Sequence, residues 1–430
     1  MFIRFFLIFL FTISIFGEII IPDKIEIYGN EVTKSYVIMQ ILKLESNKTY
    51  DTSKSEVYIN NLIKSGLFES ASIEFENRGD QNIMMISVKE QFFLLPVPFL
   101  RFHNNGTEDL SYVGMLLYRN LLGMNHDVYF LASFGYQKQY KLNYNAKTFR
   151  NSDFYFNSSI EFGEYTDKKY FREADDIFHD IFSIEFKPGY HINDYTKINF
   201  LMRYNERNFA GPGLKNSFIT LGSEFKWDNF DRFNYPTKGY YIESSLNYNF
   251  PAGEDNVNFV NTTLDLSKPF KLFDGPNDSP FILSTNVRLN FNHGDEMMPQ
   301  DKIFLNYDEL IRGFNPVITG DSYARLSLAL RIKSLDETFS VQLFDKKKNS
   351  LRVEMVTELF VDNGFIGKSY TDFEDLNESL VTTVGLSHYV KNPFAANWIR
   401  FDFGYSTESM SGYFYDKEKF RFSLALVEFL

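Results

Sequence analysis

Two neighbouring segments, PFILSTNVRLNFN at residues 280–292 and SYARLSLALRIK at residues 322–333, decide the fold class of this chain. Apolar and polar residues alternate along both segments, and successive side chains of a strand point to opposite faces. The apolar faces carry Phe281, Leu283, Val287, Leu289 and Phe291 in the first segment and Leu326, Leu328, Leu330 and Ile332 in the second. The polar faces carry Ser284, Asn286, Arg288, Asn290 and Asn292, and then Arg325, Ser327, Arg331 and Lys333. Each segment is therefore predicted to be a strand with one face toward an apolar environment and the other toward water.

The same alternation recurs along most of the chain after Pro96. About sixteen segments of roughly ten residues each, divided by clusters of Gly, Asn, Asp and Pro, follow the pattern of a transmembrane β-barrel. They begin near residues 97, 110, 126, 138, 153, 181, 196, 217, 240, 257, 280, 322, 351, 380, 397 and 419. A soluble sandwich would bury the apolar faces against a second sheet, but the charge density of the polar faces favours a wet lumen. We predict an all-β barrel of about 16 antiparallel strands over residues 93–430.

The composition of the 430 residues agrees with this prediction. Phe and Tyr, at 48 and 27 residues, raise the aromatic share to 18%, and aromatic side chains favour strands. A net charge of -12 argues against a nucleic-acid-binding protein, which needs a basic surface for the phosphate backbone. The absence of cysteine excludes disulfides and thiolate metal sites. The six histidines are scattered without ligand spacing, so no metal or cofactor is expected and the chain is not predicted to be an enzyme.

Residues 1–17 have the pattern of a secretory signal peptide. Arg4 supplies a positive charge, residues 5–16 are almost entirely apolar, and Gly17 is a small residue where cleavage is expected. An uncleaved anchor is the alternative. No later window holds about eighteen consecutive apolar residues, so no membrane-spanning helix is predicted in the mature chain.

Residues 22–91 have the mixed pattern of a small α+β domain. Apolar residues alternate in three short stretches and recur at helical spacing in two others. Ser53 and Glu56 form a capping box before the second helical stretch. The predicted order is strand, helix, helix, strand, strand, at residues 25–27, 37–42, 57–66, 71–75 and 83–88.

The strand predicted near residue 351 carries several charges on one face. Its parity aligns Arg352, Glu354, Glu358, Phe360 and Asp362. Since these carboxylates face the same lumen as the arginines of the strand at 322, structural ion pairs are predicted in preference to a catalytic pair of carboxylates.

A long connection over residues 293–321 separates the strands that begin at 280 and 322. It contains Ile311-Arg312-Gly313-Phe314, and a loop of this length is more often functional than accidental. The guanidinium of Arg312, next to the flexible Gly313, could enter the lumen and bind a carboxylate such as Asp362. On residue types alone, an ordinary exposed turn is the alternative.

These motifs resemble those of the BamA/TamA-like outer-membrane assembly and translocation superfamily, the bacterial surface antigen proteins. Residues 25–30 (IEIYGN) with Thr33, and residues 62–68 (LIKSGLF), are similar to parts of a single polypeptide-transport-associated (POTRA) repeat. Residues 311–314 resemble the signature Arg-Gly-Phe loop of the barrel, and residues 360–364 (FVDNG) resemble its Phe-x-Asp-x-Gly motif. Further similar motifs lie at residues 120–123 (NLLG), 227–229 (WDN) and 235–239 (YPTKG).

The resemblance implies that Arg312 inserts with its loop into the lumen and contacts Asp362. The predicted site consists of the loop motif Ile311, Arg312, Gly313 and Phe314, and of the anchoring residues Phe360, Asp362, Gly364 and Glu358. The family's seam between the first and last strands is the second feature, because Pro96 and Pro98 remove two backbone donors there. The alternative is that these prolines simply end the linker between the domains.

The implied function is an outer-membrane assembly or insertion factor, or a protein translocase, in a bacterial outer membrane with the POTRA-like domain in the periplasm. Unfolded outer-membrane or secreted polypeptides would bind a strand edge of that domain by β-augmentation, at Ser70, Ala71, Ser72, Ile73, Glu74 and Phe75. Outer-membrane lipid is a further partner, and accessory periplasmic or lipoprotein subunits are candidates. One alternative is a secretion pore for one exported polypeptide. The other is a passive porin, which has no need of a POTRA-like module.

Overall fold

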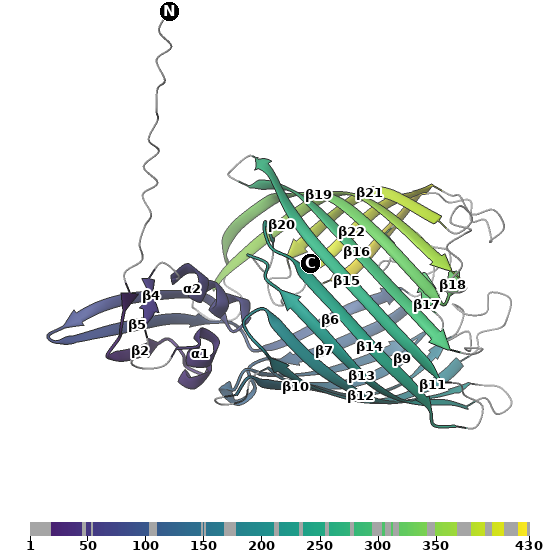
Figure 1. Ribbon diagram of the computed structural model, residues 1–430, viewed down its shortest axis with the longest axis horizontal. Coiled ribbons are helices and arrows are strands. Elements are labelled where there is room, and N and C mark those ends of the chain that lie inside the picture. The colour runs from purple at the N-terminus through teal and green to yellow at the C-terminus, as the bar shows by residue number, and fades with distance from the viewer. Residues whose placement is uncertain are drawn as a thin grey trace, which may run out of the picture. The chain divides into compact units, whose positions relative to one another are not determined.

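The computed structural model describes residues 19–44, 49–52, 55–102, 110–147, 149, 152–166, 178–209, 215–231, 235–253, 258–275, 279–294, 303–305, 311–312, 318–341, 349–367, 380–391, 398–407 and 420–427. The predicted signal peptide lies outside these residues. The chain divides into two compact units, one ending at Gln91 and the other beginning at Phe92 (Figure 1). Each unit is described by itself.

The N-terminal unit is a three-stranded sheet with two helices. Its elements are β1 (Ile19–Ile20), β2 (Lys24–Tyr28), α1 (Ser35–Leu42), β3 (Tyr50–Asp51), α2 (Ser55–Lys64), β4 (Phe68–Arg78) and β5 (Gln81–Glu90). The sheet order is β2-β5-β4, with β2 parallel and β4 antiparallel to β5. The main elements thus follow the predicted order. The short pair of β1 with β3 is absent from the prediction, because strands of two residues carry no periodicity.

Apolar side chains from the helices and the sheet form the core of this unit. The buried residues are Val37, Ile38, Leu42, Tyr50, Leu62, Leu67, Phe68, Ile83, Met84, Ile86 and Val88. Gly29 follows β2 with a φ of 82°, and a Cβ there would lie 1.9 Å from the carbonyl oxygen of Val88, so only glycine fits. Of the predicted capping box, Ser53 lies outside the described residues, and the neighbouring Ser55 hydroxyl donates to the carbonyl of Thr52 at 2.7 Å.

The second unit is an antiparallel sheet of 16 strands that curls into a barrel (Figure 1). Its strands are β6 (Leu94–Phe102), β7 (Leu110–Tyr118), β8 (His126–Gly135), β9 (Lys138–Ala146), β10 (Phe154–Thr166), β11 (Phe178–His191), β12 (Thr196–Phe209), β13 (Lys215–Asp228), β14 (Tyr241–Pro251), β15 (Phe259–Asp274), β16 (Pro280–Gly294), β19 (Ser322–Val341), β20 (Asn349–Gly367), β21 (Leu380–Lys391), β22 (Trp398–Thr407) and β23 (Phe420–Val427). Each strand pairs with the next barrel strand along the chain, so the order runs from β6 to β23.

The predicted strand starts agree closely with those observed. The largest differences are three residues, where 97 compares with Leu94 and 181 compares with Phe178. The earlier start of β6 settles the place of the two prolines, because Pro96 pairs with Leu116 and Pro98 with Gly114 inside the strand. The alternative that these prolines end the linker is therefore wrong. They lie in the first strand of the sheet. Proline has no backbone N–H to donate, and an edge strand accepts it because one side of that strand has no partner within the sheet.

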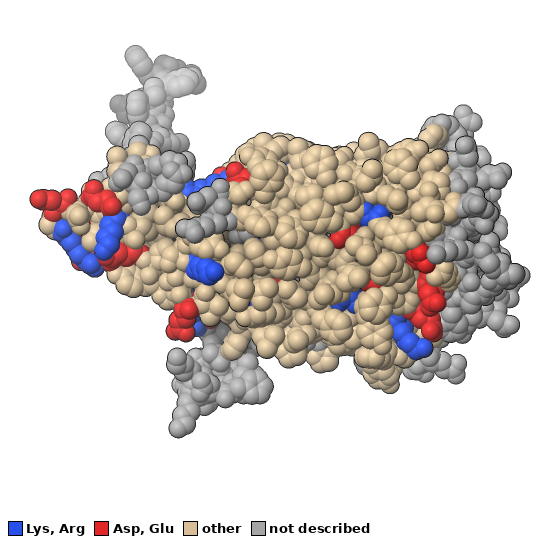
Figure 2. Space-filling model, turned by 90° about the horizontal axis from the view of Figure 1, so that it is seen from below, with Lys and Arg blue, Asp and Glu red and all other residues tan. Residues whose placement is uncertain are grey.

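The two faces of the barrel wall differ as the alternation predicts. Leu326 and Leu359 point outward, with 42% and 57% of their surface exposed, whereas Ser327, Glu358 and Asp362 point inward and are buried. Figure 2 shows few charged side chains over the middle of the outer face. In the described parts of the chain, no helix combines the length and apolar character needed to cross a membrane.

The segment between β16 and β19, residues 295–321, is here called the long connection. It contains a small antiparallel pair, β17 (Ile303–Leu305) with β18 (Ile318–Gly320). These three-residue strands are not predicted from the sequence because they are too short to show alternation. A three-residue helical turn, η2 (Leu121–Gly123), joins β7 to β8.

Candidate functional site

Arg312 of the long connection lies inside the barrel and contacts the wall at β20. Its Nε donates to Oδ2 of Asp362 at 2.8 Å, and its Nη2 donates to Oδ1 of the same carboxylate at 2.7 Å. The backbone N–H of Arg312 also points at Oδ2 of Asp362, at 3.2 Å. Two parallel charge-assisted bonds of this kind fix both the position and the orientation of a guanidinium. Arg312 is 6% exposed and Asp362 is fully buried.

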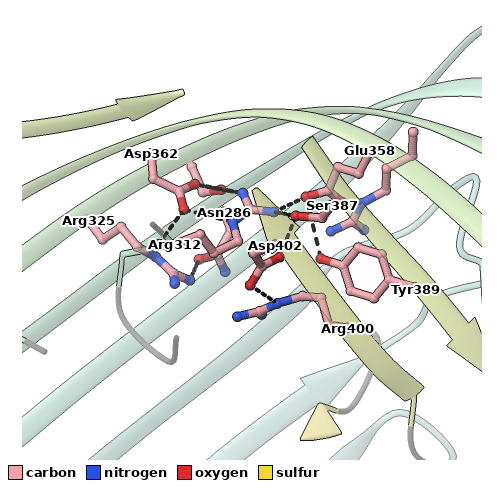
Figure 3. A network of polar contacts seen from close by, with 11 residues as sticks. Asn286, Arg312, Arg325, Glu358, Asp362, Ser387, Tyr389, Arg400 and Asp402 are labelled. Atoms are coloured by element: carbon pink, nitrogen blue, oxygen red, sulfur yellow. Dashed lines mark hydrogen bonds and ion pairs between the residues drawn. The ribbon is translucent and has the colours of Figure 1, made fainter. Parts of the chain in front are cut away.

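The guanidinium of Arg312 also reaches a second carboxylate on β20 and two further strands. Nη1 bonds to Oε1 of Glu358 on β20 and lies 3.5 Å from the Ser387 hydroxyl on β21. Nη2 donates to the hydroxyl of Ser327 on β19 at 3.0 Å. The guanidinium carbon also lies 3.8 Å from the centre of the Phe360 ring, a cation–π contact. The cation is therefore held by hydrogen bonds on its edges, which Figure 3 shows in part, and by an aromatic ring on its face.

Further polar side chains fix the two carboxylates that hold Arg312. The hydroxyl of Ser327 donates to Oδ1 of Asp362 at 2.5 Å. Nε of Arg331 donates to Oε2 of Glu358 at 2.5 Å, so Glu358 bridges two arginines. The Tyr389 hydroxyl lies 3.4 Å from Oε1 of Glu358. Because the carboxylates are themselves bonded, Arg312 meets a preorganised receptor.

The network extends along the lumen wall on both sides. On β22, Arg400 donates to Asp402 at 2.7 Å, and the Ser387 hydroxyl donates to the other oxygen of that carboxylate at 2.6 Å. On β16, Arg288 donates to Asp265 of β15 at 2.7 Å, and Asn286 accepts a bond from Arg325. Figure 3 shows Arg400, Asp402, Ser387, Asn286 and Arg325 gathered around Arg312. Six neighbouring strands thus supply one continuous polar surface.

Strand register explains why these residues meet. On β19 and β20 the Cα partners are Ser327 with Asp362 and Arg331 with Glu358, so hydroxyl and carboxylate, and then cation and carboxylate, stand opposite each other. Val356, Glu358, Phe360 and Asp362 alternate with outward-facing residues and form one lumen-facing row. The strand therefore offers Arg312 two anions with an aromatic ring between them.

The buried charges at the centre of the site balance. Arg312 and Arg331 carry two positive charges, and Glu358 and Asp362 carry two negative charges. A buried ion pair of this kind adds little net stability, whereas removing one partner leaves an uncompensated charge at a cost of about 3–5 kcal/mol. The arrangement is thus well suited to holding the long connection in a single position.

The structure brings together several of the predicted site residues. Arg312, Glu358, Phe360 and Asp362 meet in the lumen as described above, and Ile311 beside them is 1% exposed. Gly364 is buried on the same strand, where its Cα partner is Arg325. Gly313 and Phe314 lie outside the described residues. The predicted client-binding residues 70–75 lie separately, on β4 of the N-terminal unit.

Ser387, Tyr389 and Asp402 belong to the network but are absent from the predicted site. They share the lumen face of β21 and β22, which alternation along those strands could indicate. Their proximity to Arg312 depends on the pairing register, which no single strand encodes. Within the described residues, no group of three or more His, Asp or Glu side chains could hold a metal ion.

Comparison with known proteins identifies the family of the barrel. The family model described as the Omp85 superfamily domain matches residues 120–426, well over half of the chain. No curated protein sequence matches the chain.

Solved structures share the fold at low sequence identity. BamA from Haemophilus ducreyi, in a form lacking POTRA domains 1-3, matches with a TM-score of 0.60 and 15% identity, covering 94% of this chain and 84% of that one. CdiB from Escherichia coli matches with a TM-score of 0.65 and 10% identity, covering 94% and 76%. CdiB from Acinetobacter baumannii matches with a TM-score of 0.56 and 12% identity, covering 95% and 74%. From the family match, the barrel fold and the lumen site together, the chain belongs to the Omp85 superfamily.

Proposed function

We propose that this protein is an outer-membrane insertase or translocase that handles polypeptide clients without covalent chemistry. The single observation that carries the proposal is the seating of Arg312 in the lumen of an Omp85 barrel, bonded to both Asp362 and Glu358. All the polar edges of this guanidinium are used to hold the loop, so the site is a structural clamp. Family membership and the likeness to BamA and CdiB structures support an outer-membrane location and a role in insertion or translocation.

The N-terminal unit is proposed to act as a single POTRA domain in the periplasm. Its element order and the resemblance of residues 25–30 and 62–68 support this assignment. In the described sheet β4 is an outer strand, and Ser70, Ser72 and Glu74 are exposed along it. An unfolded client that adds a strand there gains backbone hydrogen bonds without strict sequence demands.

The barrel is proposed to close where β6 meets β23, and this seam is proposed to be weak. Pro96 and Pro98 have the same parity, so the two donors that they lack belong to the same edge of β6. One edge of β6 pairs with β7 along the whole strand. We therefore assign the two missing donors to the opposite edge, which faces the seam. An unsatisfied strand edge at this position would template a client strand and lower the barrier to its insertion into lipid.

Depletion of the protein followed by quantitative proteomics of outer membranes and culture medium tests the proposal. An Arg312→Ala strain is compared with an Arg203→Ala strain, because Arg203 forms a separate ion pair with Glu185 in the wall, at 2.5 Å. We expect many unrelated barrels to fall after depletion and in the Arg312→Ala strain, with little change in the Arg203→Ala strain. Unchanged levels of membrane and secreted proteins after depletion would contradict the proposal.

A second candidate is a secretion pore dedicated to one exported polypeptide, which the likeness to two CdiB structures favours. In that case depletion would remove one secreted or surface protein and leave other barrels intact. Single-channel recordings discriminate further, because a dedicated pore would be blocked by one particular polypeptide and not by unfolded barrels in general.

A further inference from the structure

A second segment enters the barrel lumen from the end opposite to the long connection. This segment is the β13–β14 turn, residues 229–240 with residues 232–234 outside the described part. Because β13 ends and β16 begins at the same end of the antiparallel sheet, the turn lies at the other end from residues 295–321. The two described parts of the turn are tied together, since Asp231 accepts hydrogen bonds from the backbone and hydroxyl of Thr237 and from the Lys238 N–H.

Tyr235 is the residue of this turn that joins a buried cluster inside the barrel. It is 2% exposed and packs in one buried cluster with Ile282 of β16, Val356 of β20 and Tyr389 of β21. Its hydroxyl donates to the carbonyl of Pro280 at 2.8 Å. In the strand order β21 is five places from β14, and Ile282 and Val356 have the parity of the lumen-facing residues. Tyr235 is therefore buried among lumen-facing side chains of strands that lie two to five places from β14 in the sheet.

The two inserted segments meet on adjacent positions of the same wall. Along β20, Val356 belongs to the same buried cluster as Tyr235, while Glu358 and Asp362 further along the same face hold Arg312. Tyr389 joins the two groups, because its ring packs in the Tyr235 cluster and its hydroxyl lies 3.4 Å from Glu358. One chain of contacts thus runs from the turn at one end to the loop from the other.

We propose that Tyr235 and Tyr389 are positioning residues for Arg312, so that the β13–β14 turn holds the long connection in its seated place. The ring of Tyr235 fixes Tyr389, Tyr389 orients the Glu358 carboxylate, and Glu358 binds the Arg312 guanidinium. Displacing the turn would loosen the loop at the far end of the lumen. This coupling bears on the proposed insertase, but its test reads the position of the loop and no client, so either idea can fail while the other stands.

The absence of cysteine in this chain makes the seating of the loop directly measurable. Ile311 is 1% exposed beside Arg312, so an Ile311→Cys variant of the full chain carries one buried thiol. Its labelling rate with a water-soluble maleimide reports how often the loop leaves its seat. Arg312→Ala in this background gives the rate for the released loop. Folded barrel is selected in every sample by its heat-modifiable mobility in gels.

With Tyr235→Ala added, we expect the labelling rate to rise roughly tenfold, the scale of coupling between residues in one contact network. Tyr235→Phe keeps the ring in the cluster and should restore most of the protection. Tyr240→Ala is the matched control, because Tyr240 lies in the same turn but is 44% exposed and bonds to Lys268 outside the cluster. It should leave the labelling rate at that of the parent.

Labelling of the folded Tyr235→Ala barrel at the parent rate would overturn the proposal. An effect equally large when Arg312 is already replaced would also overturn it, because Tyr235 would then act on general stability and not through Arg312. Should Tyr235→Ala fail to fold, Tyr389→Phe carries the test by removing one oxygen atom. Faster labelling of that variant supports the proposal, and the parent rate contradicts it.

Discussion

At the scale of single residues, the site depends on the charge of Asp362 and not only on its shape. Asp362 accepts two hydrogen bonds from one edge of the Arg312 guanidinium and one from Ser327, and it is fully buried. An amide of the same size could keep some of these bonds but would leave Arg312 and Arg331 with one carboxylate between them. The buried charges would then no longer balance.

We therefore predict that Asp362→Asn destabilises the barrel by about 3 kcal/mol, the lower part of the cost of breaking a buried ion pair. Urea unfolding of the purified protein in micelles measures this change. Arg312→Ala combined with Asp362→Ala should cost about 1–3 kcal/mol less than the sum of the single variants, because neither then leaves a buried charge alone. Simple additivity would mean that the two residues do not interact.

A second prediction at this scale concerns Glu26 in the N-terminal unit. Hydrogen bonds from Lys24 and Tyr28 lower the pKa of the Glu26 carboxyl from 4.5 to about 2. A lowered pKa means that the folded state favours the ionised form, so this contribution is present above pH 4.5 and is lost as the pH falls toward 2. The contribution is small because the ion pair lies at the surface, where its Lys24 partner is exposed and solvent screens the charges.

Carbon-detected NMR titration of Glu26 in the full chain should give a midpoint near 2, and Lys24→Ala should move it upward. A Glu26 midpoint that Lys24→Ala leaves unchanged would show that the hydrogen bond from Lys24 is not the cause.

At the scale of elements, the first barrel strand is notable for its missing backbone donors. Two of the nine residues of β6 are prolines, and its partner β7 has none. Restoring the donors with Pro96→Ala and Pro98→Ala should add up to two hydrogen bonds at the seam, each worth about 0.5–1.5 kcal/mol. We predict a higher urea midpoint for this double variant and slower client insertion.

The control for this prediction is Pro188→Ala, since Pro188 lies within β11, away from the seam, and pairs with Phe156 of β10. An unchanged midpoint in the β6 variant would show that the two missing donors do not limit the stability of the seam. A higher midpoint with unchanged client insertion would separate seam stability from function.

Elements also show what sequence can and cannot predict. The barrel strands start within three residues of their predicted positions because alternation is written locally in each segment. The pairs of β1 with β3 and of β17 with β18 are too short for such a signal. The faces of Glu358 and Asp362 follow from parity. The contacts of Ser387 and Asp402 do not, because they depend on the register between strands and on how far the long connection enters the lumen.

At the scale of the whole molecule, two segments of the chain place side chains inside the barrel. The long connection enters from one end through Arg312, and the β13–β14 turn enters from the other through Tyr235. Both contact β20, the strand that carries the carboxylates of the clamp. An interior that holds segments of its own chain fits the proposed handling of polypeptides better than passive diffusion of solutes.

The most direct test of the central claim is the amount of client inserted or exported per folded barrel in the Arg312→Ala strain, with the Arg203→Ala strain as control. We predict that the amount of client handled per folded barrel falls by at least about tenfold, while the amount of folded barrel falls far less. A tenfold loss corresponds to about 1.4 kcal/mol of lost interaction. Equal loss of function and of folded barrel, or full function with Arg312 absent, would contradict the claim that the seated loop is a working part of the protein.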